Sequence, residues 1–105
     1  MSLEPTLPSG WEYADSQKQQ ALQAEYQREL PTIHPLYGID VSAIAYRECN
    51  DDILVRHTQE TDRVSVVHLT WIMKKEFANF PRVDFTGSFQ EFIQWEYQMY
   101  GLEPE

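Results

Sequence analysis

The sequence predicts an α+β fold in which a three-stranded antiparallel meander is covered on one face by two helices. Three observations lead to this class. Helix-forming residues with an apolar stripe occupy 16–30 and 89–100, three strand-length segments rich in β-branched residues lie between 41 and 71, and short polar turns separate those segments. Because 105 residues is the size of one domain, we expect an N-terminal arm over 1–10 and a single α+β domain over 11–105.

The first expected element is a helix that begins after an N-cap at Asp15 or Ser16. Segment 16–30 contains neither glycine nor a β-branched residue, and its large apolar residues recur every four positions: Leu22, Tyr26 and Leu30. Pro31 ends this helix, and the prolines and glycine that follow predict a connecting turn over 32–38.

Three strands are expected next, over 41–48, 53–58 and 64–71. The polar spacers 49–52 and 59–63 have the length of hairpin turns, so the three strands are expected to pair as an antiparallel meander.

The faces of this meander follow from its register, because side chains alternate between the two sides of a sheet. Pairing Glu48 with Ile53 and Thr58 with Val64 places an almost wholly apolar set on the core face: Ile44, Tyr46, Ile53, Val55, Val67, Leu69 and Trp71. The same register places a mixed set on an outer, solvated face: Ala43, Ala45, Arg47, Leu54, Arg56, Val66, His68 and Thr70.

A long loop over 72–86, with a short edge strand near 83–85, is expected to lead into the C-terminal helix. Ser88 and Glu91 have the spacing of a capping box, which predicts a helix over 89–100 that ends at Gly101. Each helix and the sheet then has one apolar face, and a two-layer sandwich buries all three.

Charge limits the classes of partner. Seventeen Asp and Glu against eight Lys and Arg give a net charge of −9, which repels nucleic-acid phosphates and anionic lipid surfaces and favours a basic protein partner. No apolar run of about 18 residues is present and the first residues do not resemble a signal peptide. The single cysteine, Cys49, permits no intrachain disulfide, so a reducing, cytoplasmic location is expected.

The sequence does not predict catalysis, a metal or a cofactor. The proposed register places His57 and His68 on opposite faces, and His34 lies in a turn, so a three-histidine metal site is not expected. Cys49 lies beside acidic residues, which raise the pKa of a thiol, and no nucleophile-elbow or phosphate-loop motif occurs.

The outer sheet face offers one candidate binding site. Arg47, Arg56 and His68 would project from three adjacent strands and form a cationic spot that holds a carboxylate or phosphate, or the acidic patch of a partner. The alternative is that each pairs with a nearby acidic side chain on a solvated face.

Two aromatic surfaces are further candidates. Trp71, Phe77 and Phe80 lie in a stretch without a regular period, where they would either contact another protein or close the core. Trp95 and Met99 lie away from the inward stripe of the last helix and would serve as a homodimer contact.

The C-terminal half contains a strand-like run, a charged loop and a helix start: Val66-Val67-His68-Leu69-Thr70-Trp71, Lys74-Lys75-Glu76, and Ser88-Phe89 with Glu91-Phe92-Ile93. This half resembles small uncharacterised bacterial α+β proteins that contain a strand with the same six residues as 66–71. Some proteins of this layout resemble immunity partners of polymorphic toxins. The resemblance implies a protein-binding role and carries over no catalytic residue. We therefore expect a non-enzymatic cytosolic interaction module, with an immunity or assembly role, and keep a small-molecule or anion-binding domain as the alternative.

Overall fold

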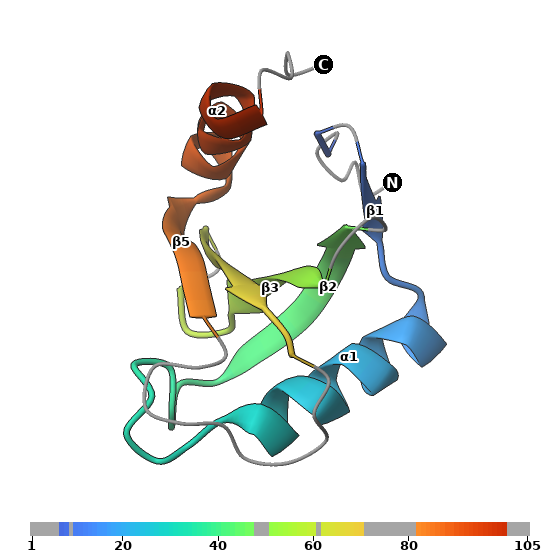
Figure 1. The fold of residues 1–105 in the computed structure, drawn as a ribbon, viewed down its shortest axis with the longest axis vertical. Coiled ribbons are helices and arrows are strands. Elements are labelled where there is room, and N and C mark those ends of the chain that lie inside the picture. Colours follow the sequence, from blue (N-terminus) through green and yellow to red (C-terminus); the bar gives the residue numbers. More distant parts are fainter. Residues whose placement is uncertain (1–6, 9, 48–50, 61, 71–81, 101–105) are drawn as a thin grey trace.

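The computed structural model describes residues 7–8, 10–47, 51–60, 62–70 and 82–100. In chain order its elements are β1 (Trp11–Tyr13), α1 (Ser16–Glu29), β2 (Val41–Arg47), β3 (Asp52–His57), β4 (Arg63–His68), β5 (Arg82–Ser88) and α2 (Phe89–Tyr100), as Figure 1 shows. The α+β class is confirmed, and both predicted helices and the three predicted strands form close to the expected positions.

The sheet has five strands in the order β1-β2-β3-β4-β5, all antiparallel, so the predicted three-stranded meander is only its centre. β1 adds one edge by pairing Trp11 with Arg47. β5 adds the other edge, where the sequence indicated only a short strand near 83–85. β1 has three residues, which is too short to show an alternating pattern of its own. It is recognised only through its pairing with β2.

The observed register differs from the predicted one by two residues in each hairpin. Ile53 lies opposite Tyr46, and Val64 lies opposite Arg56. A shift of two keeps side chains on their predicted faces near the turn, but beyond the bulge in β2 the shift is three, so the predicted faces of Ala43 and Ile44 are wrong. A bulge between Ala43 and Ala45 adds one residue to β2, so Ala43 packs with the α1 side of the sheet and its neighbour Ile44 with the α2 side.

The two helices lie on opposite faces of the sheet, so the predicted two-layer arrangement is wrong (Figure 1). α1 packs on the face that presents Ile53 and Val67, whereas α2 packs on the face that presents Leu54 and Val66. The prediction assigned Leu54 and Val66 to a solvated surface, but both are completely buried. Consecutive apolar residues in β3 and β4 indicate strands that are covered on both sides.

Both helices begin at the predicted caps. The Asp15 carboxylate accepts a hydrogen bond from the Lys18 backbone N–H at 2.7 Å, and Ser88 and Glu91 exchange the two bonds of a capping box.

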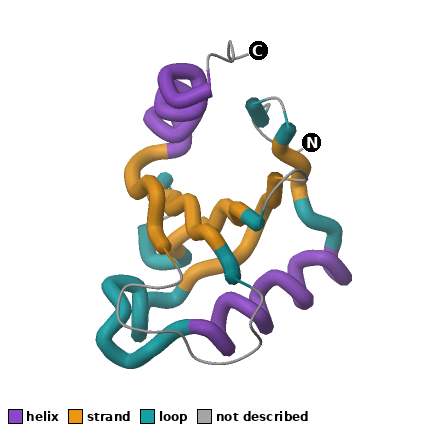
Figure 2. The backbone as a smooth tube through the Cα atoms, in the orientation of Figure 1, coloured by secondary structure: helices purple, strands orange, loops and turns teal. Residues whose placement is uncertain are grey.

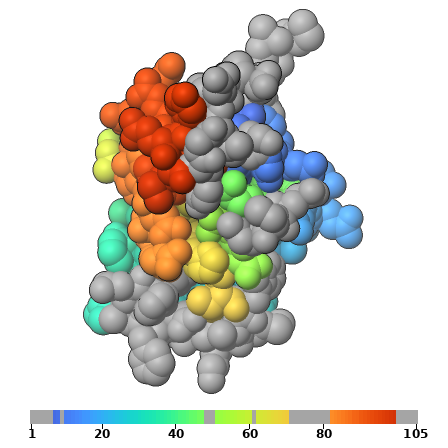
Figure 3. All heavy atoms as spheres, turned by 45° about the horizontal axis from the view of Figure 1, so that its top comes forward, coloured from blue at the N-terminus to red at the C-terminus, as the bar shows by residue number. Residues whose placement is uncertain are grey.

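The space-filling view shows α2 beside β5 on the surface (Figure 3). The tube view shows the loop between α1 and β2 at one end of the molecule, away from α2 (Figure 2).

Candidate functional site

Two of the three predicted cationic residues meet at one carboxylate. Arg47 at the end of β2 and His68 at the end of β4 flank Asp52, the first residue of β3. The His68 Nδ1 lies 2.7 Å from one Asp52 oxygen, and the Arg47 Nε lies 3.8 Å from the other. The sheet register explains this grouping, because Asp52 pairs directly with His68 and Arg47 ends the strand on its other side.

Arg47 is buried rather than presented to solvent, with 5% of its side chain exposed. Its Nη2 donates to Glu96 Oε2 of α2, and its guanidinium lies over the Trp11 ring, 4.8 Å from the centroid. A guanidinium held by two carboxylates and an aromatic face is already neutralised, so this arrangement favours a structural role in joining the sheet to α2.

His68 is the more accessible member of this group, with 36% of its side chain exposed. Asp52 orients the ring, as a carboxylate orients a catalytic histidine. In the part of the chain that the structure describes, however, no hydroxyl or thiol hydrogen-bonds His68. Among the residues that the structure describes, the pair therefore has no bonded nucleophile of the kind that such chemistry requires.

Arg56 lies apart from this group, four residues further along β3 from Asp52 on the same face. It is half-buried and borders a small hollow of about 170 Å³ together with Tyr13 and Gln19. Among the described residues no carboxylate forms an ion pair with Arg56, and its buried Nε makes no hydrogen bond.

The predicted aromatic surfaces have different outcomes. Trp71, Phe77 and Phe80 lie outside the described residues. Trp95 stacks on Phe85 of β5, with ring centroids 5.3 Å apart, so it packs within the protein. Met99 is 60% exposed on α2, and a homodimer through this helix stays a prediction.

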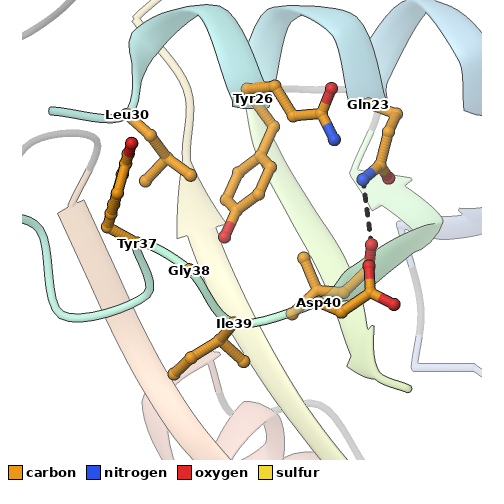
Figure 4. Close-up of a pocket in the computed structure, with 9 residues that line it drawn as sticks. Gln23, Tyr26, Leu30, Tyr37, Gly38, Ile39 and Asp40 are labelled. Atoms are coloured by element: carbon orange, nitrogen blue, oxygen red, sulfur yellow. Dashed lines mark hydrogen bonds between the residues drawn. The ribbon is translucent and has the colours of Figure 1, made fainter. Parts of the chain in front are cut away.

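A pocket that the sequence analysis did not predict lies between the C-terminal half of α1 and the segment that enters β2 (Figure 4). Its volume is about 310 Å³. Leu30, Tyr37 and Ile39 supply apolar walls. Tyr26 extends from α1 with its hydroxyl directed toward Gly38 and Ile39, and only 2% of the residue is exposed.

The frame of this pocket is fixed by backbone contacts. The Gln23 amide donates to the Val41 carbonyl at 2.9 Å and accepts from the Ala43 N–H at 2.9 Å, which ties α1 to β2. Gly38 has a φ of +81°, a conformation that glycine adopts without strain and that turns the chain toward Ile39. Burial raises the pKa of the Tyr26 phenol above its ordinary range, so this group stays neutral.

The same connection exposes large apolar side chains to solvent. Ile33 is 72% exposed, Tyr37 is 52% exposed and Ile39 is 42% exposed. We call these three residues the Ile33 surface. The prolines of segment 32–38 led to its interpretation as a simple turn, but a turn that carries apolar residues is itself a signal of a contact site.

A buried polar chain lies on the α1 face at the other end of the strands. The Nε2 of His57 lies 2.9 Å from Ser65 Oγ, which lies 2.8 Å from Thr86 Oγ1. Burial lowers the pKa of His57, Arg63 lowers it further, and Glu60 opposes this shift. Within the described ranges, no three His, Cys, Asp or Glu side chains are grouped so as to hold a metal ion.

No protein-family model, curated protein or solved structure matches this chain. Among the helices that the structure describes, none combines the length and the apolar character needed to cross a membrane.

Proposed function

We propose that the protein is a non-enzymatic cytoplasmic interaction module that binds a basic protein through the Ile33 surface. The observation that carries this proposal is the exposure of three large apolar side chains within seven residues, at 72%, 52% and 42%. Large apolar side chains that are exposed close together in the sequence are typical of contact sites on proteins. An immunity-type or assembly role, as in the proteins that 64–93 resemble, is the form that this binding takes.

Charge supports a basic partner. The net charge of −9 accelerates association with a cationic protein, and the apolar side chains then supply affinity as they leave water. Ile33 is the best anchor because it is the most exposed of the three and does not line the Tyr26 pocket.

The experiment compares three tagged forms of the full chain, namely the parent, Ile33→Ser and Met99→Ser, in capture from the source cells. Met99→Ser is the matched control, because it also removes an exposed apolar side chain but lies on α2. The parent and Met99→Ser should recover one stoichiometric basic protein. With that protein purified, Ile33→Ser should weaken binding about tenfold, and added salt should slow association.

Three results would overturn this proposal. The proposal fails if the captured protein is acidic, if Ile33→Ser leaves its binding unchanged, or if Met99→Ser abolishes its binding. The last result would place the interface on α2.

Arg56 supports a second candidate function, the binding of a small anion. Its guanidinium borders a hollow and pairs with no carboxylate among the described residues. Inorganic phosphate should then raise the melting temperature of the parent and not that of Arg56→Gln. No shift in the parent, or an equal shift in both, rejects this function.

A further inference from the structure

The Tyr26 hydroxyl is a buried polar group without a partner. Tyr26 is 2% exposed, and its hydroxyl makes no hydrogen bond within the described residues. The neighbouring Gln23 amide bonds to the backbone of β2 through its nitrogen and its oxygen, and it makes no hydrogen bond to the Tyr26 hydroxyl. A buried hydroxyl without a partner is costly to keep, so an acceptor atom placed beside it would remove that cost.

The pocket around Tyr26 has the properties of a small-molecule site. Its volume of about 310 Å³ is at the lower end of the range for such sites, roughly 300–1,000 Å³. Leu30, Ile39 and Val41 provide an apolar wall and Tyr37 an aromatic one. A few polar groups in an apolar pocket fix the orientation of a ligand.

The lining also selects the charge of the ligand. Of the nine described lining residues, one is charged, Asp40, and it is acidic. None of these described lining residues is an arginine or lysine, and the protein carries a net charge of −9. An anionic ligand is therefore repelled. The described lining offers no cation that could compensate a carboxylate for the water it loses on binding.

We propose that this pocket binds a small uncharged molecule with an apolar body and one carbonyl oxygen, which accepts a hydrogen bond from the Tyr26 hydroxyl. The body contacts Leu30, Tyr37 and Ile39, and the carbonyl points toward α1. Ile33 itself does not line the pocket, whereas Tyr37 and Ile39 belong to both the Ile33 surface and the pocket lining.

Benzamide and benzoate are suitable probes, because they share a ring and differ in charge. In NMR titrations of the parent, benzamide should shift the backbone amide signals of Gly38 and Ile39, and benzoate should not. Tyr26→Phe should weaken benzamide binding about fivefold, the value of one neutral hydrogen bond. Tyr97→Phe is the matched control, since it removes an exposed hydroxyl on α2, and it should leave binding unchanged.

The titration of the parent tests the proposal even if Tyr26→Phe folds poorly. The proposal is overturned if benzamide shifts only protein amide signals outside 23–41. It is also overturned if benzamide shifts no signal up to its solubility limit. Equal affinity of the parent and folded Tyr26→Phe overturns it as well, as does benzoate binding as tight as that of benzamide. None of these results depends on a protein partner, so the two proposals fail separately.

Discussion

Several polar side chains are fully enclosed in this protein, and their neighbours decide what each one costs. Both carboxylate oxygens of Glu29 accept the backbone N–H of Thr70, at 3.0 and 3.2 Å. Glu25, one turn earlier on α1, pairs with Arg28 at 2.9 Å. Tyr26 is different because its hydroxyl has no hydrogen bond in the described part of the chain. This contrast makes the phenol a group whose removal can be tested.

Replacing Tyr26 with phenylalanine should stabilise the ligand-free protein. The substitution keeps the buried ring and removes a hydroxyl whose burial is uncompensated, so the free energy of unfolding should rise by about 1 kcal/mol. Urea denaturation of the parent and the variant measures this change. Tyr97→Phe, at an exposed position, should change it by less than about 0.5 kcal/mol. A loss of stability in Tyr26→Phe would show that the hydroxyl is bonded.

His57 makes stability depend on pH in a defined direction. Its pKa in the folded protein is below the ordinary 6.5, because burial and Arg63 disfavour the charged ring. In the interval between these two pKa values the unfolded chain binds more protons than the folded one, so acidification lowers the free energy of unfolding. His57→Gln should lose less stability than the parent between about pH 7 and pH 5. Urea denaturation at several pH values measures the difference, and parallel curves for the two proteins would contradict it.

At the scale of elements, local patterns determine some features and tertiary contacts the others. The helices and central strands were predictable because caps, periodicity and β-branched runs are local signals. β1 was not, because a strand of three residues has no pattern apart from its pairing with β2. The bulge after Ala43 depends on packing on both faces, which no single strand reveals. In the candidate site, Arg47 and His68 were correctly grouped on one face, but the burial of Arg47 under α2 could not be foreseen.

The capping box at the start of α2 can be tested by substitution. Ser88 Oγ accepts from the Glu91 N–H at 3.1 Å, and Glu91 Oε1 accepts from the Ser88 N–H at 2.9 Å. Ser88→Ala leaves a helix N–H without this acceptor and should lower the free energy of unfolding by about 1 kcal/mol. Ser88→Asp restores an acceptor and should recover most of the loss. Thermal unfolding followed by circular dichroism measures both, and equal loss in the two variants would contradict the capping role.

At the scale of the whole molecule, one buried ion group joins the sheet to its second helix. Arg47 contacts Asp52 of β3, Glu96 of α2 and the Trp11 ring of β1. The two hydrophobic clusters lie on opposite faces of the sheet, and Arg47 lies on the α2 side. The position of α2 therefore depends on a polar contact as well as on Phe92 and its neighbours.

A double-mutant cycle on Arg47 and Glu96 measures how strongly this contact joins the two parts. Arg47→Met leaves the Glu96 carboxylate buried without its cation, which should cost about 3–5 kcal/mol, whereas Arg47→Met with Glu96→Leu removes both charges and should cost less. The coupling energy from chemical denaturation should be about 1–3 kcal/mol. Additive effects would mean that Glu96 is stabilised by other groups. If the double variant, Arg47→Met with Glu96→Leu, still binds the partner protein, the contact between Arg47 and Glu96 serves the fold alone. The binding sites then lie elsewhere on the molecule.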